Sequence, residues 1–113
     1  MSHSKMTARH SVVLFSTDTR NNAASLTREA VVRRMAAGGH VAGPVLSTYW
    51  WQGELKESQE WMAWFETKTE DVEALTEFLI AKHPYVTPAV ITLPITHGYP
   101  GFLQWIAAEA TSH

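Results

Sequence analysis

A chain of 113 residues, of which 45% are apolar and five are tryptophan, suits a single globular domain and is too apolar to be intrinsically disordered. Its formal net charge of −2 at pH 7 argues against nucleic acid and anionic membranes as partners. The lack of cysteine excludes disulfides, thiolate metal ligands and cysteine nucleophiles, and it is compatible with a cytoplasmic protein.

The two ends of the chain lack the apolar patterning of the part between them. We expect residues 1–10 to form a disordered N-terminal tail and residues 11–110 to form one domain. The tail also lacks the apolar segment of a secretory signal. No run of 18 apolar residues occurs, so the sequence predicts no membrane-spanning helix.

The domain is predicted to begin with a strand and a helix. Residues 11–16 are short, apolar and β-branched, which is typical of a buried strand. Residues 19–22 offer good N-caps, and residues 23–37 carry apolar side chains at helical spacing. Gly38 and Gly39 are expected to end this helix, because glycine readily adopts the left-handed cap conformation.

A long hairpin is predicted next. Residues 41–51 and 55–67 indicate two strands joined around residues 52–54. Residues 61–65 are apolar on both faces of the second strand, so both faces should be covered. Helices would cover one face, and a sheet from another subunit would cover the other.

The last part of the chain predicts a helix, a strand and a short closing helix. Residues 70–82 are expected to be helical, with Thr69 as N-cap and Pro84 as the stop signal. Residues 89–95 then form a strand, and residues 100–110 a helix. The resulting order, β-α-β-β-α-β with a C-terminal helix, predicts an α+β domain of the ferredoxin-like, split βαβ type.

Three blocks of residues carry a resemblance to a known family. They are Ser11 to Thr17; Tyr49 to Leu55 with Glu60 and Glu66-Thr67 after it; and the stretch from His83 to Trp105, with its His83-Pro84-Tyr85, Leu93-Pro94-Ile95 and Phe102-Leu103-Gln104-Trp105 segments. In this order the chain resembles the CutA family of divalent-cation-tolerance proteins over about residues 11–108. The resemblance implies the same fold, a homotrimer whose edge strands pair between subunits, and a non-enzymatic role linked to divalent cations, copper among them.

The resemblance also implies where metal ligands would lie. In the family they are a cysteine at the end of the first strand, a histidine just before the His-Pro-Tyr block and a glutamate just after it. The matching positions hold Ser16, Lys82 and Ala89, and a further family cysteine matches Gly38. A hydroxyl, a cation and a methyl group suit a soft metal poorly. We therefore expect the family's metal ligands to be largely lost, with at most weak divalent-cation binding and no other cofactor.

The histidines give little support to a metal site. His3, His10 and His113 lie in the expected tails and should be solvated. His83 has two interpretations, a cap at the end of the preceding helix or a ligand-binding group, and the cap is favoured. His97 is likewise expected to form a hydrogen bond within a turn.

A cleft between subunits is the second site that the resemblance implies. A ligand there would lie near the hairpin and the His-Pro-Tyr loop, among Tyr49, Trp51, Glu60, Glu66, Lys68, Lys82, His83 and Tyr85. Glu66 replaces a family lysine, so ligand preference should move away from anions. The favoured alternatives are that Glu66 and Lys68 form an ordinary interface or surface ion pair and that the tryptophans serve core and interface packing.

Two functions follow from these observations. The first is a CutA-like homotrimer associated with divalent-cation tolerance. The alternative is a recruited small-molecule or nucleotide-binding protein, or an enzyme, that uses the cleft, by analogy with the fold-related trimeric nitrogen-regulatory signalling proteins. The altered Ser16, Glu66, Lys82 and Ala89 motivate this alternative, and no catalytic residue is assigned.

Overall fold

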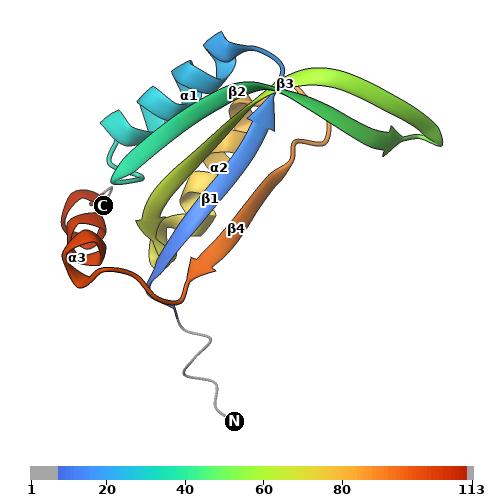
Figure 1. The fold of residues 1–113 in the computed structure, drawn as a ribbon. Coiled ribbons are helices and arrows are strands. Elements are labelled where there is room, and N and C mark those ends of the chain that lie inside the picture. Colours follow the sequence, from blue (N-terminus) through green and yellow to red (C-terminus); the bar gives the residue numbers. More distant parts are fainter. Residues whose placement is uncertain (1–7, 112–113) are drawn as a thin grey trace.

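A computed structural model describes residues 8–111, which form a four-stranded antiparallel sheet and three α-helices (Figure 1). The elements are β1 (His10–Thr17), α1 (Arg20–Val32), β2 (Gly38–Trp51), β3 (Glu54–Lys68), the 3-10 turn η2 (Thr69–Asp71), α2 (Val72–Lys82), β4 (Val90–Ile95) and α3 (Pro100–Glu109). The strand order β2-β3-β1-β4 is that of the split βαβ plan, so the predicted ferredoxin-like α+β fold is confirmed. Within residues 8–111, every helix falls short of the length and apolarity that a membrane crossing requires.

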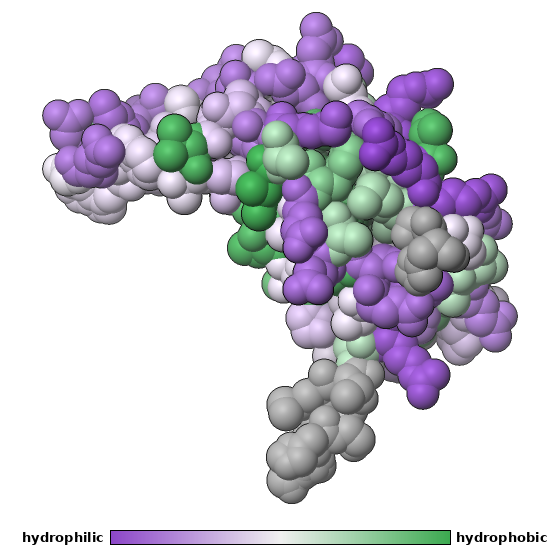
Figure 2. All heavy atoms as spheres, turned by 180° about the vertical axis from the view of Figure 1, so that it is seen from behind, coloured by the Kyte–Doolittle hydropathy of each residue, from purple (hydrophilic) through white to green (hydrophobic). Residues whose placement is uncertain are grey.

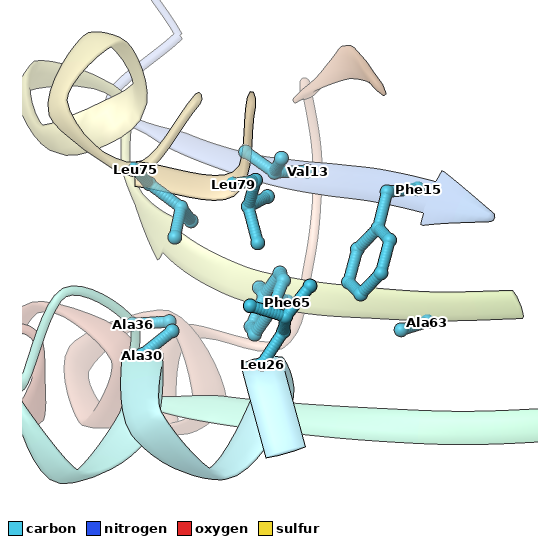
Figure 3. Close-up of a cluster of buried hydrophobic side chains, with 9 residues drawn as sticks. All are labelled: Val13, Phe15, Leu26, Ala30, Ala36, Ala63, Phe65, Leu75 and Leu79. Atoms are coloured by element: carbon cyan, nitrogen blue, oxygen red, sulfur yellow. The ribbon is translucent and has the colours of Figure 1, made fainter. Parts of the chain in front are cut away.

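The hydrophobic core lies between one face of the sheet and helices α1 and α2 (Figure 3). Phe15 of β1 and Phe65 of β3 are stacked at its centre, with ring centroids 6.0 Å apart. Leu75 and Leu79 of α2 and Leu26 of α1 close over these rings and are buried. Burying each such side chain contributes about 1.5–3 kcal/mol, so this layer fixes the helices on the sheet.

The opposite face of the sheet also carries apolar side chains. Strand alternation and register place Met62 and Trp64 of β3 on this face, together with Ile91 and Leu93 of β4. Ile91 and Leu93 are 53% and 49% exposed, and the two β3 residues are only partly buried. The strand at residues 61–65 is therefore apolar on both faces, but this subunit covers only one of them.

The ends of the domain differ slightly from expectation. His10, expected to lie in the tail, is the first residue of β1 and pairs with Lys68 of β3. His3 and His113 lie outside the described residues. His97 is exposed in the segment before α3 and makes no hydrogen bond with any residue from 8 to 111, so the expected turn hydrogen bond is absent.

Helix α1 ends at Val32, before the glycine pair that was expected to stop it. Arg34 adopts the left-handed conformation, with φ of 60°. Its N–H donates to the Val31 carbonyl at 2.9 Å, and the Met35 N–H donates to the Ala30 carbonyl at 3.0 Å. These two bonds form a Schellman motif, so an arginine takes the position where glycine is usual.

Gly38 and Gly39 instead begin β2, where they allow close packing. A Cβ atom on Gly39 would lie 2.6 Å from Thr27 Cγ2 and 3.1 Å from the Phe65 ring. A Cβ atom on Gly38 would lie 3.0 Å from Glu66 Oε1. The expectation that these residues cap the helix was wrong, because their missing side chains are required by the contact between β2, β3 and α1.

The two predicted N-caps have different outcomes. Thr19, one of the candidates among residues 19–22, caps α1, since its Oγ1 accepts a hydrogen bond from the Asn22 N–H at 3.0 Å, and the helix begins at Arg20 and not at residue 23. Thr69 does not cap α2, because η2 precedes that helix. The Thr69 hydroxyl instead lies 2.8 Å from Ser11 Oγ, where it ties the start of α2 to β1.

Residues 45–60 form a two-stranded arm that extends beyond the body of the sheet (Figure 1). β1 pairs with β3 only from Trp61 onward, and a bulge between Ala42 and Val45 bends β2 where the arm begins. Gln52 and Gly53 close the hairpin with φ of 51° and 81°. Positive φ at both central residues is typical of a type I′ turn. Seen from behind, the arm projects from the body and is largely hydrophilic (Figure 2).

We predict that Gly39→Ala lowers the free energy of unfolding by about 1–3 kcal/mol, because the added methyl group overlaps Thr27 and Phe65. Urea unfolding at one fixed subunit concentration measures this. Gly53→Asn is the control, since nothing lies within 4 Å of a Cβ there and asparagine tolerates the left-handed region. A loss no larger than that of the control would contradict the packing role of Gly39.

Candidate functional site

An open cavity of about 580 Å³ lies at the base of the arm, which is within the usual size range of ligand pockets. Three segments enclose it: the end of β1, the arm, and the loop between α2 and β4. The lining residues are Ser16, Asp18, Ser47, Tyr49, Trp51, Ser58, Gln59, Glu60, Tyr85, Val86, Thr87 and Ala89.

Strand alternation explains which arm residues reach the cavity. Ser47 lies opposite Ser58 in the register of β2 and β3, and Tyr49 and Trp51 follow on the same face. Glu60 shares that face because it is two residues from Ser58. Trp50 points to the other side and is 72% exposed, so only one of the adjacent tryptophans lines the cavity, as their spacing predicts.

His83 holds the loop that closes the cavity. Its Nε2 lies 2.6 Å from the Ser16 carbonyl oxygen, and its Nδ1 accepts the Tyr85 N–H at 3.1 Å. These partners place the ring proton on Nε2 and leave no free nitrogen lone pair for a metal. His83 is the C-cap residue of α2, as expected, and its backbone N–H donates to the Ile80 carbonyl at 3.3 Å. Its imidazole, however, bonds to the end of β1 and not to the helix carbonyls.

Tyr85 and Glu60 form the polar contact beneath the loop. The Tyr85 hydroxyl donates to Glu60 Oε2 at 2.9 Å, and Glu60 is only 8% exposed. Glu60 Oε1 accepts no hydrogen bond within residues 8–111. Burial, this hydrogen bond and the charges of Glu60 and Asp18 together raise the pKa of Tyr85 well above its ordinary range. The phenol therefore stays a donor, and Glu60 keeps one open oxygen.

Asp18 supplies the second carboxylate. Its Oδ1 accepts hydrogen bonds from Asn22 Nδ2 at 2.8 Å and from Thr17 Oγ1 at 3.2 Å. The Asn22 bond is the main cause that lowers the pKa of Asp18, so this group is ionised at neutral pH. The lining set contains no lysine, arginine or histidine, so its two carboxylates are not offset by a basic side chain in the lining.

The structure brings together only part of the predicted ligand site. Tyr49, Trp51, Glu60 and Tyr85 all line the cavity. Lys82 does not: its Nζ lies 3.8 Å from Glu29 Oε2 and over the Phe78 ring, on the helix side. Lys82 therefore adds no positive charge to the lining of the cavity within one subunit.

Glu66 and Lys68 lie at the other end of β3, beside the start of β1. Within one subunit they do not form an ion pair with each other, and a pair across an interface stays a prediction. Both Glu66 oxygens contact His40 Nε2, at 2.9 and 2.8 Å, and Lys68 Nζ lies 3.5 Å from Glu70 Oε2. His40 is better placed because it lies on the neighbouring strand and stacks on Trp64. That Glu66 and Lys68 reach a cleft across a subunit interface stays a prediction.

The sequence interpretation missed several cavity residues. Asp18 directly follows β1, at the same end of the sheet as the arm. This position could have indicated that Asp18 lines the cavity. Ser47 and Ser58 could have been predicted from strand alternation, because both lie on the same face of the hairpin as Glu60. No group of three or more His, Cys, Asp or Glu that could hold a metal occurs in the described part of the chain.

We predict that stability declines as the pH rises from about 9 to about 11 through the ordinary tyrosine pKa of 10.0, because unfolded Tyr85 ionises there and folded Tyr85 does not. Tyr85→Phe should remove that part of the decline. Urea unfolding across this pH range measures it, with the 78% exposed Tyr99 changed to Phe as the control. Equal pH slopes for the Tyr85→Phe variant and the parent would show that the Tyr85–Glu60 contact does not hold.

Comparison with known proteins places the chain in a family. It is 33% identical over 102 residues to a CutA homolog of Danio rerio, covering 90% of this chain and 68% of that protein. It is 32% identical over 98 residues to a divalent-cation tolerance protein CutA of Escherichia coli, covering 87% and 88%. It spans 56% and 48% of the lengths of the relatives from Xenopus laevis and Mus musculus.

Solved structures agree with this placement. A divalent cation tolerance protein (Cut A1) of Thermus thermophilus superposes with a TM-score of 0.86 at 31% identity, covering 90% of this chain and 99% of that one. CutA1 from Oryza sativa superposes with a TM-score of 0.88 at 27% identity, covering 95% and 98%. The profile of the CutA1 divalent ion tolerance proteins matches residues 11–109. The chain therefore belongs to the CutA1 divalent ion tolerance protein family.

Proposed function

We propose that this protein acts in tolerance of divalent cations as a homotrimer, without a tight copper site. The observation that carries the proposal is the family match, which spans residues 11–109 and so includes every strand and helix apart from the first residue of β1. The relative from Escherichia coli is named for divalent-cation tolerance. The chemistry at the family's ligand positions supports the second half of the proposal.

Two surfaces support self-association. The free face of the sheet presents Met62, Trp64, Ile91 and Leu93, which together form an apolar patch on the central and edge strands. The arm is a two-stranded ribbon, and such a ribbon is only marginally stable by itself in water. Its exposed apolar residues are Leu46, Tyr49, Trp50, Trp51 and Leu55. Neighbouring copies of the chain would cover the free face of the sheet and the side of the arm that carries Leu46, Trp50 and Leu55, opposite the cavity.

We predict a mass of three times the 12.7 kDa subunit in sedimentation equilibrium at micromolar concentration. Trp64→Glu should shift this mass toward the monomer, because it places a charge in the free face of the sheet. Ala74→Glu, on the exposed side of α2 and away from both surfaces, is the matched control. A monomer mass for the parent protein would contradict the homotrimer.

The family's ligand positions hold no soft donor. Ser16 and Ala89 both line the cavity, so the first and third positions remain close together. Lys82 faces Glu29 and Phe78 instead. A hydroxyl and a methyl group cannot replace a thiolate and a carboxylate, so copper should bind weakly.

We predict weak Cu(II) binding by calorimetric titration, measured on a His3→Ala, His113→Ala variant to remove the end histidines. Restoring the two family donors whose positions line the cavity, with Ser16→Cys and Ala89→Glu, should raise the affinity at least about tenfold. Ser16→Ala with Ala89→Gln is the control for structural perturbation. One tightly held copper per subunit in the unrestored protein would contradict the loss of the site.

We also place the protein in the cytoplasm, with composition as the support, because a chain without cysteine needs no oxidising compartment. One structural neighbour, from Archaeoglobus fulgidus, is described as periplasmic. Cell fractionation with marker proteins for each compartment tests this location.

A further inference from the structure

We propose that the cavity at the base of the arm binds a small organic cation, a compound with a substituted ammonium group, through Asp18, Glu60 and the aromatic rings of Tyr49 and Trp51. This goes beyond cation tolerance, because the ligand is an organic molecule. All of its lining residues come from one subunit, so the site needs no side chain from another copy.

The charge of the lining favours a cation. Asp18 and Glu60 bring two carboxylates to one cavity, and the rest of its lining brings no basic side chain. Both carboxylates line the same cavity as Tyr85, whose hydroxyl donates to Glu60. An anionic ligand would meet this field unfavourably, whereas a cation would be attracted by both groups.

Glu60 is the specific anchor. It is 8% exposed, and Tyr85 occupies only its Oε2. The other oxygen, Oε1, has no hydrogen-bond donor within residues 8–111, although the group is among the few buried charges of the subunit. A carboxylate oxygen held in place by a tyrosine and left open on a cavity is suited to contact a ligand's positive charge.

The aromatic rings provide the second part of the site. Tyr49 and Trp51 lie two residues apart on the cavity face of the arm, and each is 41% exposed. The Tyr49 hydroxyl lies 3.3 Å from Ser58 Oγ, which limits the movement of that ring. Indole and phenol faces attract substituted ammonium groups, and a neighbouring carboxylate adds to that attraction.

A metal ion fits this cavity less well. The two carboxylates are joined by no third His, Cys, Asp or Glu within the described part of the chain. Divalent ions need at least three or four such donors or their oxygen equivalents for tight binding. A ligand with a diffuse charge and an apolar surface uses all parts of the lining, including Val86 and Ala89.

The test compares two probes of the same shape. Choline and 3,3-dimethyl-1-butanol differ in one atom, nitrogen or carbon, and so in charge alone. Each gives one strong methyl resonance, whose saturation-transfer signal on the intact protein yields a dissociation constant. The measurement is made with a chelator present, so failure here leaves the divalent-cation proposal untouched. We expect choline to bind at least about fivefold more tightly than its neutral analogue.

Substitutions locate the binding. Glu60→Gln keeps an acceptor for the Tyr85 hydroxyl and removes the charge, and Asp18→Asn removes the charge of an exposed group. Each should reduce the preference for choline at least about threefold. Glu57→Gln is the matched control, because Glu57 lies on the opposite face of the arm, bonded to Thr48, and should change nothing.

The proposal also predicts that Trp51→Leu weakens the binding of choline and leaves the binding of the neutral analogue unchanged, since leucine keeps the apolar surface and lacks the ring. Near-ultraviolet circular dichroism shows whether each variant keeps its packing. Equal affinity for the two probes would overturn the proposal. So would a preference for choline that survives both Glu60→Gln and Asp18→Asn in folded variants.

Discussion

The architecture depends on the unequal lengths of two paired strands. β3 has 15 residues, and its inner neighbour β1 has only eight. β1 ends opposite Trp61, so the rest of β3 has β2 as its single partner and leaves the body as the arm. The loops after β1 and after α2 meet at this step in the sheet. The cavity lies beyond the end of β1, where the sheet narrows to β2 and β3 and no strand fills the space between the arm and the two loops.

Alternation along β3 then assigns each side chain to an environment. Ala63 and Phe65 face the helices and form the core, while Met62 and Trp64 face away from them. Glu60 shares the second face, and it is buried by the loop that carries Tyr85. One strand therefore supplies the core, an uncovered apolar surface and the anchor of the cavity, because successive residues point to opposite faces.

A chain of hydrogen bonds connects the loop to this strand. The Ser16 carbonyl, His83, Tyr85 and Glu60 are linked in sequence by contacts of 2.6, 3.1 and 2.9 Å. The series satisfies the Ser16 carbonyl, both His83 nitrogens, the Tyr85 hydroxyl and one of the two Glu60 oxygens, which lowers the cost of burying them. The same network uses both nitrogens of His83, so the histidine of the His-Pro-Tyr block positions the cavity wall.

The order of elements, the hairpin turn, an N-cap within residues 19–22 and the family were all predictable from sequence, because each depends on local periodicity, turn chemistry or short motifs. Four cavity residues were also predicted as a group. Partners between distant segments were not: Glu66 pairs with His40, and Gly39 packs on Thr27. The sequence by itself determined which faces are apolar and which strands exist. Only the tertiary structure decided which polar groups meet, because such contacts depend on loop paths and strand register, which local patterns do not encode.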